Sequence, residues 1–346
     1  MLASRKIGKA PGPNGDFAAL KDLLDPHLRA LREYLDGQAE RFEPEIRDLV
    51  RYCLTSGGKR IRASLVFLGG WRDAGLVSED HIRAAAVVEL VHLATLIHDD
   101  ILDSAATRHN RPTAARAYGP HTAVLLGDAI FSQAVHLSTR FPTTEVCHRV
   151  SLATRRVCVG EITQTLRSEK DRFDLEDYWR VVDLKTAELF AVSAFLGAKL
   201  ADYPEEFAEA AGAFGRHLGV AYQVYDDLVD FFGREEKAGK TLGTDLDSGR
   251  LTLPLLLLQA KLGSNSEECS GGTDGPDGKR VRAEQMLHHG VFQEVVDWVH
   301  SEIEQAEKVL RPYREFPPAS RLAQVSELLK GQMAALEADN AARVTT

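Results

Sequence analysis

Apolar residues recur every three or four positions along most of the chain, and this spacing is the feature that most limits its fold. In the first run they stand at Phe17, Leu20, Leu23, Leu24, Leu28, Leu31 and Leu35. Similar runs cover residues 41–54, 60–75, 79–103, 119–141, 143–168, 174–200, 203–232, 251–262 and 280–340. A period near 3.6 gathers such residues on one face of an α-helix, whereas a half-buried strand alternates. No alternating run is followed by an Asn-Gly-type hairpin turn, so the pattern predicts an all-α protein.

The expected helices are separated by clear stop signals. These are Gly57-Gly58, Gly119-Pro120, Phe141-Pro142 and Tyr203-Pro204. The runs 79–103 and 203–232 are apolar on more than one face, which is typical of helices in the middle of a bundle. No interdomain linker is visible. We therefore expect one domain over residues 1–346, with a flexible N-terminus (1–16) and a mobile Gly/Ser/acidic loop (263–279).

Composition argues against several classes of protein. The formal net charge of −9, without a basic stripe, disfavours a nucleic-acid binder. The N-terminus lacks the apolar core of a signal peptide, and no stretch approaches the roughly 20 apolar residues that span a bilayer. The four cysteines form no C-x-x-C pair, which indicates reduced thiols in a cytoplasmic protein rather than a zinc site or a disulfide framework.

Two aspartate triplets with the same spacing interrupt apolar helices. The run ELVHLATLIHDDILD ends in Asp99, Asp100 and Asp103, and AYQVYDDLVDFF contains Asp226, Asp227 and Asp230. Helical residues four apart lie one above the other. The first and last aspartates of each triplet therefore share a face, with the middle one about 100° round the axis.

Such carboxylates repel one another and are costly to bury, so each triplet calls for a cation. Hard oxygen ligands without an imidazole or thiolate favour Mg²⁺ over zinc, and Mg²⁺ usually bridges a few carboxylates to substrate phosphates. One Asp-Asp-x-x-Asp motif is equally compatible with a solvated helix end. Two copies on strongly apolar helices favour a metal–phosphate site.

Basic residues near the expected loops could bind the phosphates of a polyphosphate substrate. A Gly turn at 56–58 opens a helix that carries Lys59 and Arg62, which suits anion binding by backbone N–H groups. Others follow the two triplets, at Arg108, Arg111, Lys240 and Arg250. Each alone is most often a solvated surface charge. Lys185 differs, because it interrupts an apolar helix beside Thr186.

With these residues assembled, the chain resembles the trans-isoprenyl diphosphate synthases, the family of farnesyl, geranylgeranyl and long-chain polyprenyl diphosphate synthases. The resemblance runs from about Arg51 to Leu258. Its segments, in family order, are GGKRIR (57–62), ELVHLATLIHDDILD (89–103), GDAIF (127–131), GEITQ (160–164), KTAELF (185–190), YQVYDDLVDFFG (222–233) and GKTLGTDLDSGRLTLP (239–254). It implies a single helical bundle of the isoprenoid synthase type with a central apolar cavity. It also implies a homodimeric, Mg²⁺-dependent enzyme that condenses isopentenyl diphosphate with an allylic diphosphate, head to tail and trans.

The resemblance implies a role for each matching residue. Isopentenyl diphosphate would be held by Lys59, Arg62 and His92. The allylic diphosphate would be held by the metals, Arg108, Lys185 and Lys240, and Arg250 is a further candidate for substrate binding. Three Mg²⁺ ions would be bound mainly by Asp99, Asp103 and Asp226, with direct or water-mediated support from Asp100, Asp227 and Asp230. The leaving oxygen and the nascent carbocation would lie near Thr186 and Gln223.

One departure from the family pattern concerns the residue after Arg108. The family usually has two adjacent arginines there, and the second helps to bind isopentenyl diphosphate, but this chain has His109. Histidine, with a reference pKa of about 6.5, is mostly neutral at pH 7 unless a phosphate raises that pKa. Two hypotheses follow: Arg111 substitutes for the missing arginine, or the affinity for isopentenyl diphosphate is weakened. A smaller departure is Ala63, where the family often has Pro.

The length of the product depends on residues before the first triplet. Family members that stop at short chains usually carry bulky aromatics four and five residues before the first Asp, where this chain has Thr95 and Ala94. Further up the helix Val91, Val88 and Val87 are also small, and Val87 lies about 18 Å from Asp99 along the axis. Ordinary core packing would also explain Ala and Val. We expect a product longer than farnesyl, hexaprenyl or beyond.

Three alternatives to a chain-elongating synthase fit the sequence less well. Terpene cyclases share the helical fold and the first triplet, but they usually replace the second with an Asn/Ser/Glu metal triad and lack the GGKRIR loop. A non-catalytic subunit of a heteromeric synthase tends to lose aspartates or phosphate-binding basic residues, whereas this chain retains nearly all of them. A purely structural helical protein would not explain carboxylate triplets inside apolar helices.

Overall fold

The computed structural model describes residues 13–55, 57–72, 78–168, 173–235, 242–243, 250–263 and 276–344, almost all of them helical. The helices are α1 (Pro13–Ala39), α2 (Pro44–Leu54), α3 (Ile61–Gly69), α4 (Glu79–Leu102), α5 (Ala114–Tyr118), α6 (Pro120–Ser138), α7 (Glu145–Ser168), α8 (Leu175–Val182), α9 (Glu188–Leu200), α10 (Glu205–Phe232), α13 (Leu253–Leu262), α15 (Pro276–His288), α16 (Val291–Leu310) and α17 (Pro317–Val344). A π-helix, η1 (Asp183–Ala187), joins α8 to α9, and a 3₁₀-helix, η2 (Arg311–Tyr313), follows α16. The prediction of an all-α bundle is confirmed.

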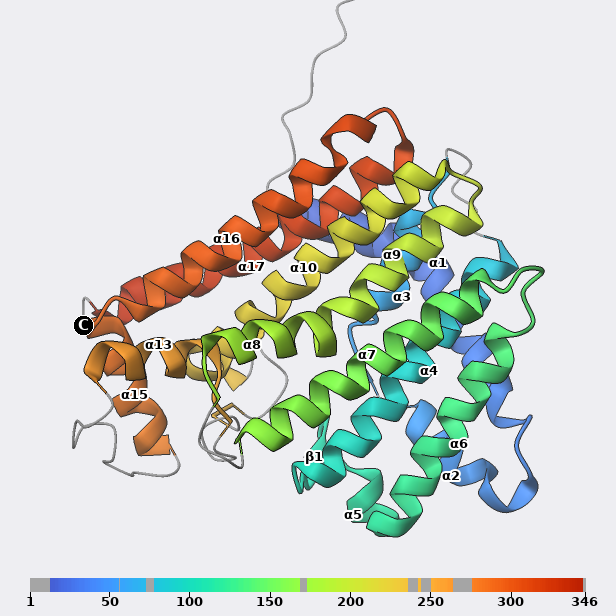
Figure 1. Ribbon diagram of the computed structural model, residues 1–346, viewed down its shortest axis with the longest axis horizontal. Helices are drawn as coiled ribbons and strands as arrows, with labels where there is room; N and C mark the ends of the chain where they lie inside the picture. Colours follow the sequence, from blue (N-terminus) through green and yellow to red (C-terminus); the bar gives the residue numbers. More distant parts are fainter. Residues whose placement is uncertain are drawn as a thin grey trace, which may run out of the picture.

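The long helices pack side by side around α4, α9 and α10 (Figure 1). On one side α10 packs against α16 and α9, and on the other α4 packs against α6. The short helix α3 lies between α4 and α9. Because α4 and α10 are each covered on several faces, both are apolar on more than one face, as their sequences indicate. The two aspartate triplets therefore belong to inner helices of the bundle.

Glycines allow α10 to approach the η1–α9 segment closely. A Cβ atom on Gly219 would lie 2.7 Å from the Cα atom of Ala187, and one on Gly215 would lie 2.4 Å from the carbonyl oxygen of Phe190. Neither distance is tolerated by a real side chain, so any larger residue would push the helices apart. This contact brings the face of α10 that carries Gln223 close to Thr186 on η1.

Two details correct the sequence-based picture. A short hairpin that the all-α prediction did not include lies at residues 107–112, where β1 (Thr107–Arg108) pairs with β2 (Arg111–Pro112) in antiparallel register. Its turn residues, His109 and Asn110, both have positive φ (49° and 58°), the arrangement of a type I′ turn. The apolar run 280–340 is divided into α15, α16 and α17 by Gly290, with φ 69°, and by the turn before Pro317.

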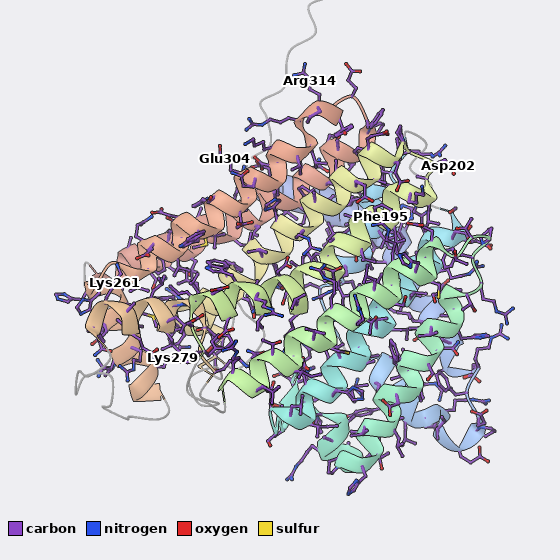
Figure 2. All side chains as sticks on the ribbon, in the orientation of Figure 1. Phe195, Asp202, Lys261, Lys279, Glu304 and Arg314 are labelled. Carbon is purple, nitrogen blue, oxygen red and sulfur yellow. The ribbon has the colours of Figure 1, made fainter. Side chains whose placement is uncertain are left out.

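Side chains are sorted between core and surface as in ordinary globular proteins (Figure 2). Phe195 lies among the helices, whereas Glu304 and Arg314 project outward. In the described part of the chain, no helix is long and apolar enough to cross a membrane. Residues 1–12 of the expected flexible N-terminus and residues 264–275 of the expected mobile loop lie outside the described residues.

Candidate active site

A cavity of about 760 Å³ lies among α3, α4, α7, η1, α10 and α17, and it brings together most of the predicted site residues. Its polar lining includes Lys59, Arg62, His92, Thr95, Asp99, Arg108, His109, Lys185, Thr186, Gln223 and Asp226. Its apolar lining includes Leu93, Leu96, Val157, Leu189 and Val229. Small-molecule sites usually combine an apolar wall with a few convergent polar groups, so this cavity is the candidate active site.

Other predicted residues lie beside the cavity rather than on its lining. These are Val91, Ala94, Asp100, Asp103, Asp227, Asp230 and Arg250. Val91 and Ala94, expected to control chain length, are almost fully buried among core residues of the bundle. Thr95 does reach the cavity, and its hydroxyl donates to the carbonyl oxygen of His92 at 2.7 Å. Lys240 lies outside the described residues.

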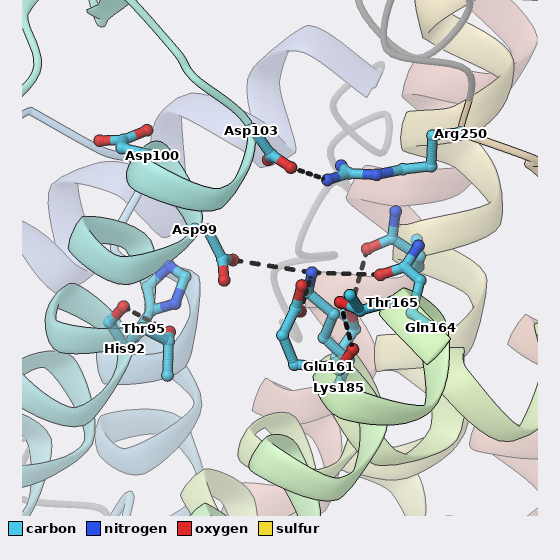
Figure 3. Close-up of polar contacts among 12 residues, drawn as sticks. His92, Thr95, Asp99, Asp100, Asp103, Glu161, Gln164, Thr165, Lys185 and Arg250 are labelled. Carbon is cyan, nitrogen blue, oxygen red and sulfur yellow. Dashed lines mark hydrogen bonds and ion pairs between the residues drawn. The ribbon is translucent and has the colours of Figure 1, made fainter. Parts of the chain in front are cut away.

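The three aspartates of the first triplet point in different directions (Figure 3). Asp99 faces the cavity and Lys185 on the opposite wall. Asp100 points to another side of α4, where it accepts hydrogen bonds from Arg108 at 2.9 and 2.7 Å. Asp103 caps the helix and is paired with Arg250 at 2.5 Å. The packing of α4 therefore gives each carboxylate a different neighbour despite the common motif.

Lys185 lies at the centre of a polar cluster opposite Asp99 (Figure 3). Its ammonium group lies 3.7 Å from Asp99, pairs closely with Glu161 and donates to Gln164 at 3.3 Å. Glu161 and Gln164 project from α7 and were given no role from sequence. Their signal was present in the segment GEITQ, but a glutamate on a helix is not distinctive without its neighbours.

Burial raises the pKa of the Asp99 carboxyl to about 6, and the nearby Glu161 carboxylate adds to the rise. Lys185 opposes it by favouring the charged form. The side chain is only 17% exposed, so its charge is poorly solvated. A cation bound beside Asp99 would stabilise the ionised carboxylate, because a second positive charge, in addition to Lys185, would offset the cost of burying the negative charge.

The π-helical turn η1 places Lys185 and the adjacent Thr186 on the cavity wall. Single π-helical turns inside α-helices occur often at functional sites. An ion cluster connects Asp183, the first residue of this turn, and Glu188, the residue that follows it, to two arginines. Arg156 lies 3.1 Å from Asp183 and 2.9 Å from Glu188, and Arg216 contacts the same two carboxylates. The cluster ties both ends of η1 to α7 and α10.

A basic group forms another wall of the cavity at the start of α3. Arg62 lies 3.1 Å from the Nε2 atom of His92 and stacks over the Phe190 ring at 4.9 Å. Burial lowers the pKa of Arg62, and burial with the nearby Arg62 charge holds the pKa of His92 well below its usual value. Lys59 is exposed beside them. An anion bound here would offset the energetic cost of burying the positive charge of Arg62.

The loop that carries this basic group is held by one buried carboxylate that sequence reasoning missed. Glu89, only 4% exposed, accepts from Arg60 at 2.7 Å and from the backbone N–H of Ala63 at 3.1 Å. Arg60 has left-handed backbone geometry, with φ 49° and ψ 39°. Such geometry is uncommon for a residue with a side chain, and the Glu89 contact helps to hold it.

His109 lines the cavity from the hairpin turn, while Arg111 points elsewhere. The Arg111 guanidinium stacks over the Tyr52 ring at 4.5 Å and donates to the carbonyl oxygen of Thr55 at 3.3 Å. Arg111 is therefore held against residues 52–55, and it does not line the cavity. This arrangement disfavours the hypothesis that Arg111 substitutes for the missing second arginine.

The three aspartates of the second triplet also have different surroundings. Asp226 lines the cavity. Asp227 is buried behind it and accepts from Gln223 at 2.8 Å and Tyr178 at 2.6 Å. Asp230 is 1% exposed and accepts from the backbone N–H of Gly243 at 3.0 Å. Of this triplet, only Asp226 faces the cavity.

The carboxylates of the cavity fit a hard divalent cation. Asp99 and Asp226 reach the same cavity from α4 and α10, and Asp103 stands one turn beyond Asp99. Within the described ranges, no three His, Cys, Asp or Glu side chains converge into a complete metal site. Mg²⁺ is commonly bound by one or two carboxylates together with substrate phosphates, so this donor set suits an ion shared with a phosphate-bearing substrate.

Comparison with known proteins identifies the family to which the chain belongs. The chain matches the model of the polyprenyl synthetase family over residues 43–270. It is 36% identical over 211 residues to the octaprenyl diphosphate synthase of Escherichia coli, covering 61% of this chain and 65% of that relative, slightly under two thirds of its length. It is 35% identical over 305 residues to the (2E,6E)-farnesyl diphosphate synthase of Mycobacterium bovis, covering 82% of this chain and 83% of that protein.

A solved structure shares nearly the whole fold. The polyprenyl synthase of Caulobacter crescentus, in complex with calcium and isoprenyl diphosphate, has a TM-score of 0.82 and 26% sequence identity. The match covers 93% of this chain and 98% of the Caulobacter protein. The family resemblance expected from the ordered motifs is confirmed. The cavity with its two aspartate helices is thus the site of a protein that belongs to the polyprenyl synthetase family.

Proposed function

We propose that this protein is a trans-polyprenyl diphosphate synthase, which condenses isopentenyl diphosphate with an allylic diphosphate head to tail. The observation that carries the proposal is that one cavity contains two separate charged regions. Asp99, Asp226 and Lys185 lie in one region, suited to a metal-bound diphosphate, and Arg62 and His92 lie in the other, suited to a second anion. The apolar residues of the same cavity suit prenyl chains.

The proposed metal is Mg²⁺, three ions per active site, bound mainly by Asp99, Asp103 and Asp226. When bound, Mg²⁺ would neutralise charge that develops on a leaving diphosphate. Asp100, Asp227 and Asp230, each exposed by 5% or less, would support these ions directly or through water.

The protein's own groups would position two substrates and stabilise charge. Arg62, His92 and Lys59 would bind isopentenyl diphosphate, and Lys185 and Arg108 would bind the allylic diphosphate. When the allylic C–O bond breaks, its electron pair goes to the diphosphate oxygen, where the preorganised cations stabilise it. The double bond of isopentenyl diphosphate then attacks the allylic carbon, and the departing diphosphate accepts the released proton. The apolar lining would exclude water from the cation.

The proposal is tested by incubating the protein with labelled isopentenyl diphosphate, Mg²⁺ and each allylic primer in turn. Chain elongation that requires both substrates and is abolished by a chelator is expected. A cyclic hydrocarbon formed from the allylic diphosphate alone would favour a terpene cyclase instead. Failure to elongate any primer would contradict the proposal.

We propose that the product is longer than farnesyl. The resemblance covers synthases of different product lengths, including octaprenyl and farnesyl relatives, so family membership alone does not set the length. Support comes from α4, where the small residue Thr95 lines the cavity one turn before Asp99. No bulky aromatic stands at this position or at the neighbouring Ala94.

A Thr95→Phe variant is expected to make shorter products, because a ring at this position would occupy cavity space beside the reacting end of the chain. Chromatography of dephosphorylated products measures the change. Ala94→Phe is the companion variant: Ala94 is 3% exposed in the core, so a Phe would reach the cavity only by displacing neighbours, at about 1–3 kcal/mol. We expect shortening there with lower stability. An unchanged product profile in both variants would refute this assignment of the chain-length wall.

A His109→Arg variant is expected to lower the KM for isopentenyl diphosphate. His109 lines the cavity, and burial and Arg108 lower its pKa, so the imidazole is neutral at pH 7. An arginine would add a permanent charge and a bidentate phosphate donor, worth about 1.5–3 kcal/mol as a charged hydrogen bond. Steady-state kinetics at saturating primer provide the measurement. His121→Arg, the same change at an exposed position on α6 outside the cavity lining, is the matched control and should leave the KM unaltered. An unchanged or raised KM in His109→Arg would contradict the weak-affinity hypothesis.

We also propose that the protein is a homodimer. Apolar side chains are exposed on the adjacent helices α6 and α7, including Leu125 (68%) and Leu166 (50%). Exposed apolar groups that share a surface are typical of association sites. Sedimentation that gives the mass of one chain at assay concentrations would contradict the dimer.

A further inference from the structure

A chain of hydrogen bonds connects the cavity wall to a tyrosine buried behind it. The Thr186 hydroxyl donates to the Gln223 carbonyl oxygen at 2.8 Å. The Gln223 amide N–H donates to one carboxylate oxygen of Asp227 at 2.8 Å, and the Tyr178 hydroxyl donates to the other at 2.6 Å. Thr186 and Gln223 line the cavity, whereas Asp227 and Tyr178 are 3% and 4% exposed.

The chemistry of the four groups fixes the direction of every bond in this chain. An ionised carboxylate only accepts hydrogen bonds, so the Asp227 end of Gln223 must be its NH₂ group. The other end of the Gln223 amide is then a carbonyl oxygen, which also only accepts. The Thr186 hydroxyl must therefore point its hydrogen at Gln223. Its two lone pairs are left to face the cavity that Thr186 lines.

We propose that Tyr178 is a positioning residue for the reaction: by holding Asp227, it makes Gln223 orient the Thr186 hydroxyl with its lone pairs toward the cavity. This inference rests on the proposed function. There, breaking the allylic C–O bond leaves a positive charge on carbon, and the electron pair stays with diphosphate. An oxygen with fixed lone pairs stabilises that charge without forming a bond and without reorganising during the reaction.

The surroundings of Tyr178 suit this role. Tyr178 and Thr186 belong to one continuous helical segment, α8 followed by η1, while Gln223 and Asp227 stand one turn apart on α10. The Tyr178 ring is packed edge-on against Trp179, with centroids 5.1 Å apart at 75°. Buried polar chains of this kind are rigid when every member has a partner. Loss of the Tyr178 hydroxyl would leave Asp227 less constrained and let the Gln223 amide rotate.

The first test compares Tyr178→Phe with Tyr203→Phe. Tyr203 is a matched control, because its partly buried hydroxyl donates to the backbone carbonyl of Trp71 at 2.9 Å, outside the cavity lining. Both variants lose one tyrosine hydroxyl and one hydrogen bond. We expect kcat to fall about tenfold in Tyr178→Phe only, the ratio that corresponds to one hydrogen bond. The KM for isopentenyl diphosphate should not change.

The second test is a double-mutant cycle with Thr186→Val, which removes the oriented hydroxyl but keeps the shape. If Tyr178 acts through Thr186, adding Tyr178→Phe to Thr186→Val should lower kcat by less than twofold, because their effects on the reaction are not independent. Full additivity of the two losses would overturn the inference.

The outcomes separate this inference from the proposed function. Absence of chain elongation in the parent protein would reject the synthase proposal itself. A parent that elongates chains while Tyr178→Phe keeps the parental kcat would reject the role of Tyr178 alone. Thermal unfolding of both tyrosine variants checks that any loss of rate is not loss of folded protein.

Discussion

An Asp99→Asn variant is expected to lose about a thousandfold in kcat/KM for the allylic substrate, while folding at least as stably as the parent. Of the first triplet, Asp99 alone lines the cavity, so the loss of its charge removes a principal ligand of the proposed metal. Metal stabilisation of transition-state charge is worth several kcal/mol, and each 1.36 kcal/mol is about tenfold in rate. Steady-state rates with the allylic primer varied, at saturating isopentenyl diphosphate and at several Mg²⁺ concentrations, give the measurement.

The stability of this variant follows from the sign of the pKa shift. Burial raises the pKa of Asp99 from its usual range to about 6, so the folded state disfavours the charged form. The buried charge therefore lowers the free energy of unfolding. This destabilisation is absent below the pKa of Asp in the unfolded chain, about 4, and is complete above pH 6. Asparagine carries no charge and avoids the cost. In a chelator at pH 7.5, the Tm of Asp99→Asn should equal or exceed the parental Tm, and the difference should narrow toward pH 5.

Asp128→Asn is the matched control for this experiment. Asp128 is on α6, its side chain is 65% exposed, and it does not line the cavity. The same chemical change there should leave the rate unaltered. Parental activity in Asp99→Asn at ordinary Mg²⁺ concentrations would show that Asp99 is not the principal ligand of the first triplet.

A Lys185→Met variant is expected to lose about 100-fold or more in kcat/KM for the allylic substrate, with little change in the KM for isopentenyl diphosphate. The ammonium lies between the Asp99 and Glu161 carboxylates, which would face each other without it. Removing one preorganised donor to developing charge typically costs about 10²–10³ in kcat. Methionine keeps the length and apolar stem of the side chain.

Two further variants test whether the loss in Lys185→Met comes from the position and charge of Lys185. Lys199→Met is the control, because Lys199 lies on the adjoining helix α9, is 38% exposed and pairs with Glu205 at the far end. Lys185→Arg should recover part of the activity, since it restores the charge but not its point-like geometry. Equal losses for both substrates in Lys185→Met would indicate a general structural role instead.

The helices and their place in the bundle were largely predictable from sequence. The apolar run 79–103 corresponds to α4, and 203–232 corresponds to α10, within two residues at each end. Periodicity is a local property, and a helix with more than one apolar face must be covered on several sides. The same logic identified Asp99 and Asp226 as members of a candidate metal site, because a buried carboxylate needs a partner.

Local rules could not predict the hairpin or the π-helical turn. Each strand has only two residues, too few to alternate, and its turn uses His109-Asn110 rather than Asn-Gly. The π-helix lies in a sequence, DLKTA, that would fit an ordinary α-helix. Its conformation is accompanied by ion pairs from Arg156 and Arg216, which are distant in sequence.

The sequence alone determined that two aspartate-rich helices lie inside an all-α bundle, and the ordered motifs identified the family. Only the tertiary structure decided which carboxylates face the cavity. Helical spacing places Asp99 and Asp100 about 100° apart, but their neighbours come from other elements: Lys185 from η1 and Arg108 from the hairpin. Likewise, the buried Tyr178 reaches Asp227 across 49 residues of chain. Such contacts depend on how helices pack, and packing is set by the whole core rather than by any local motif.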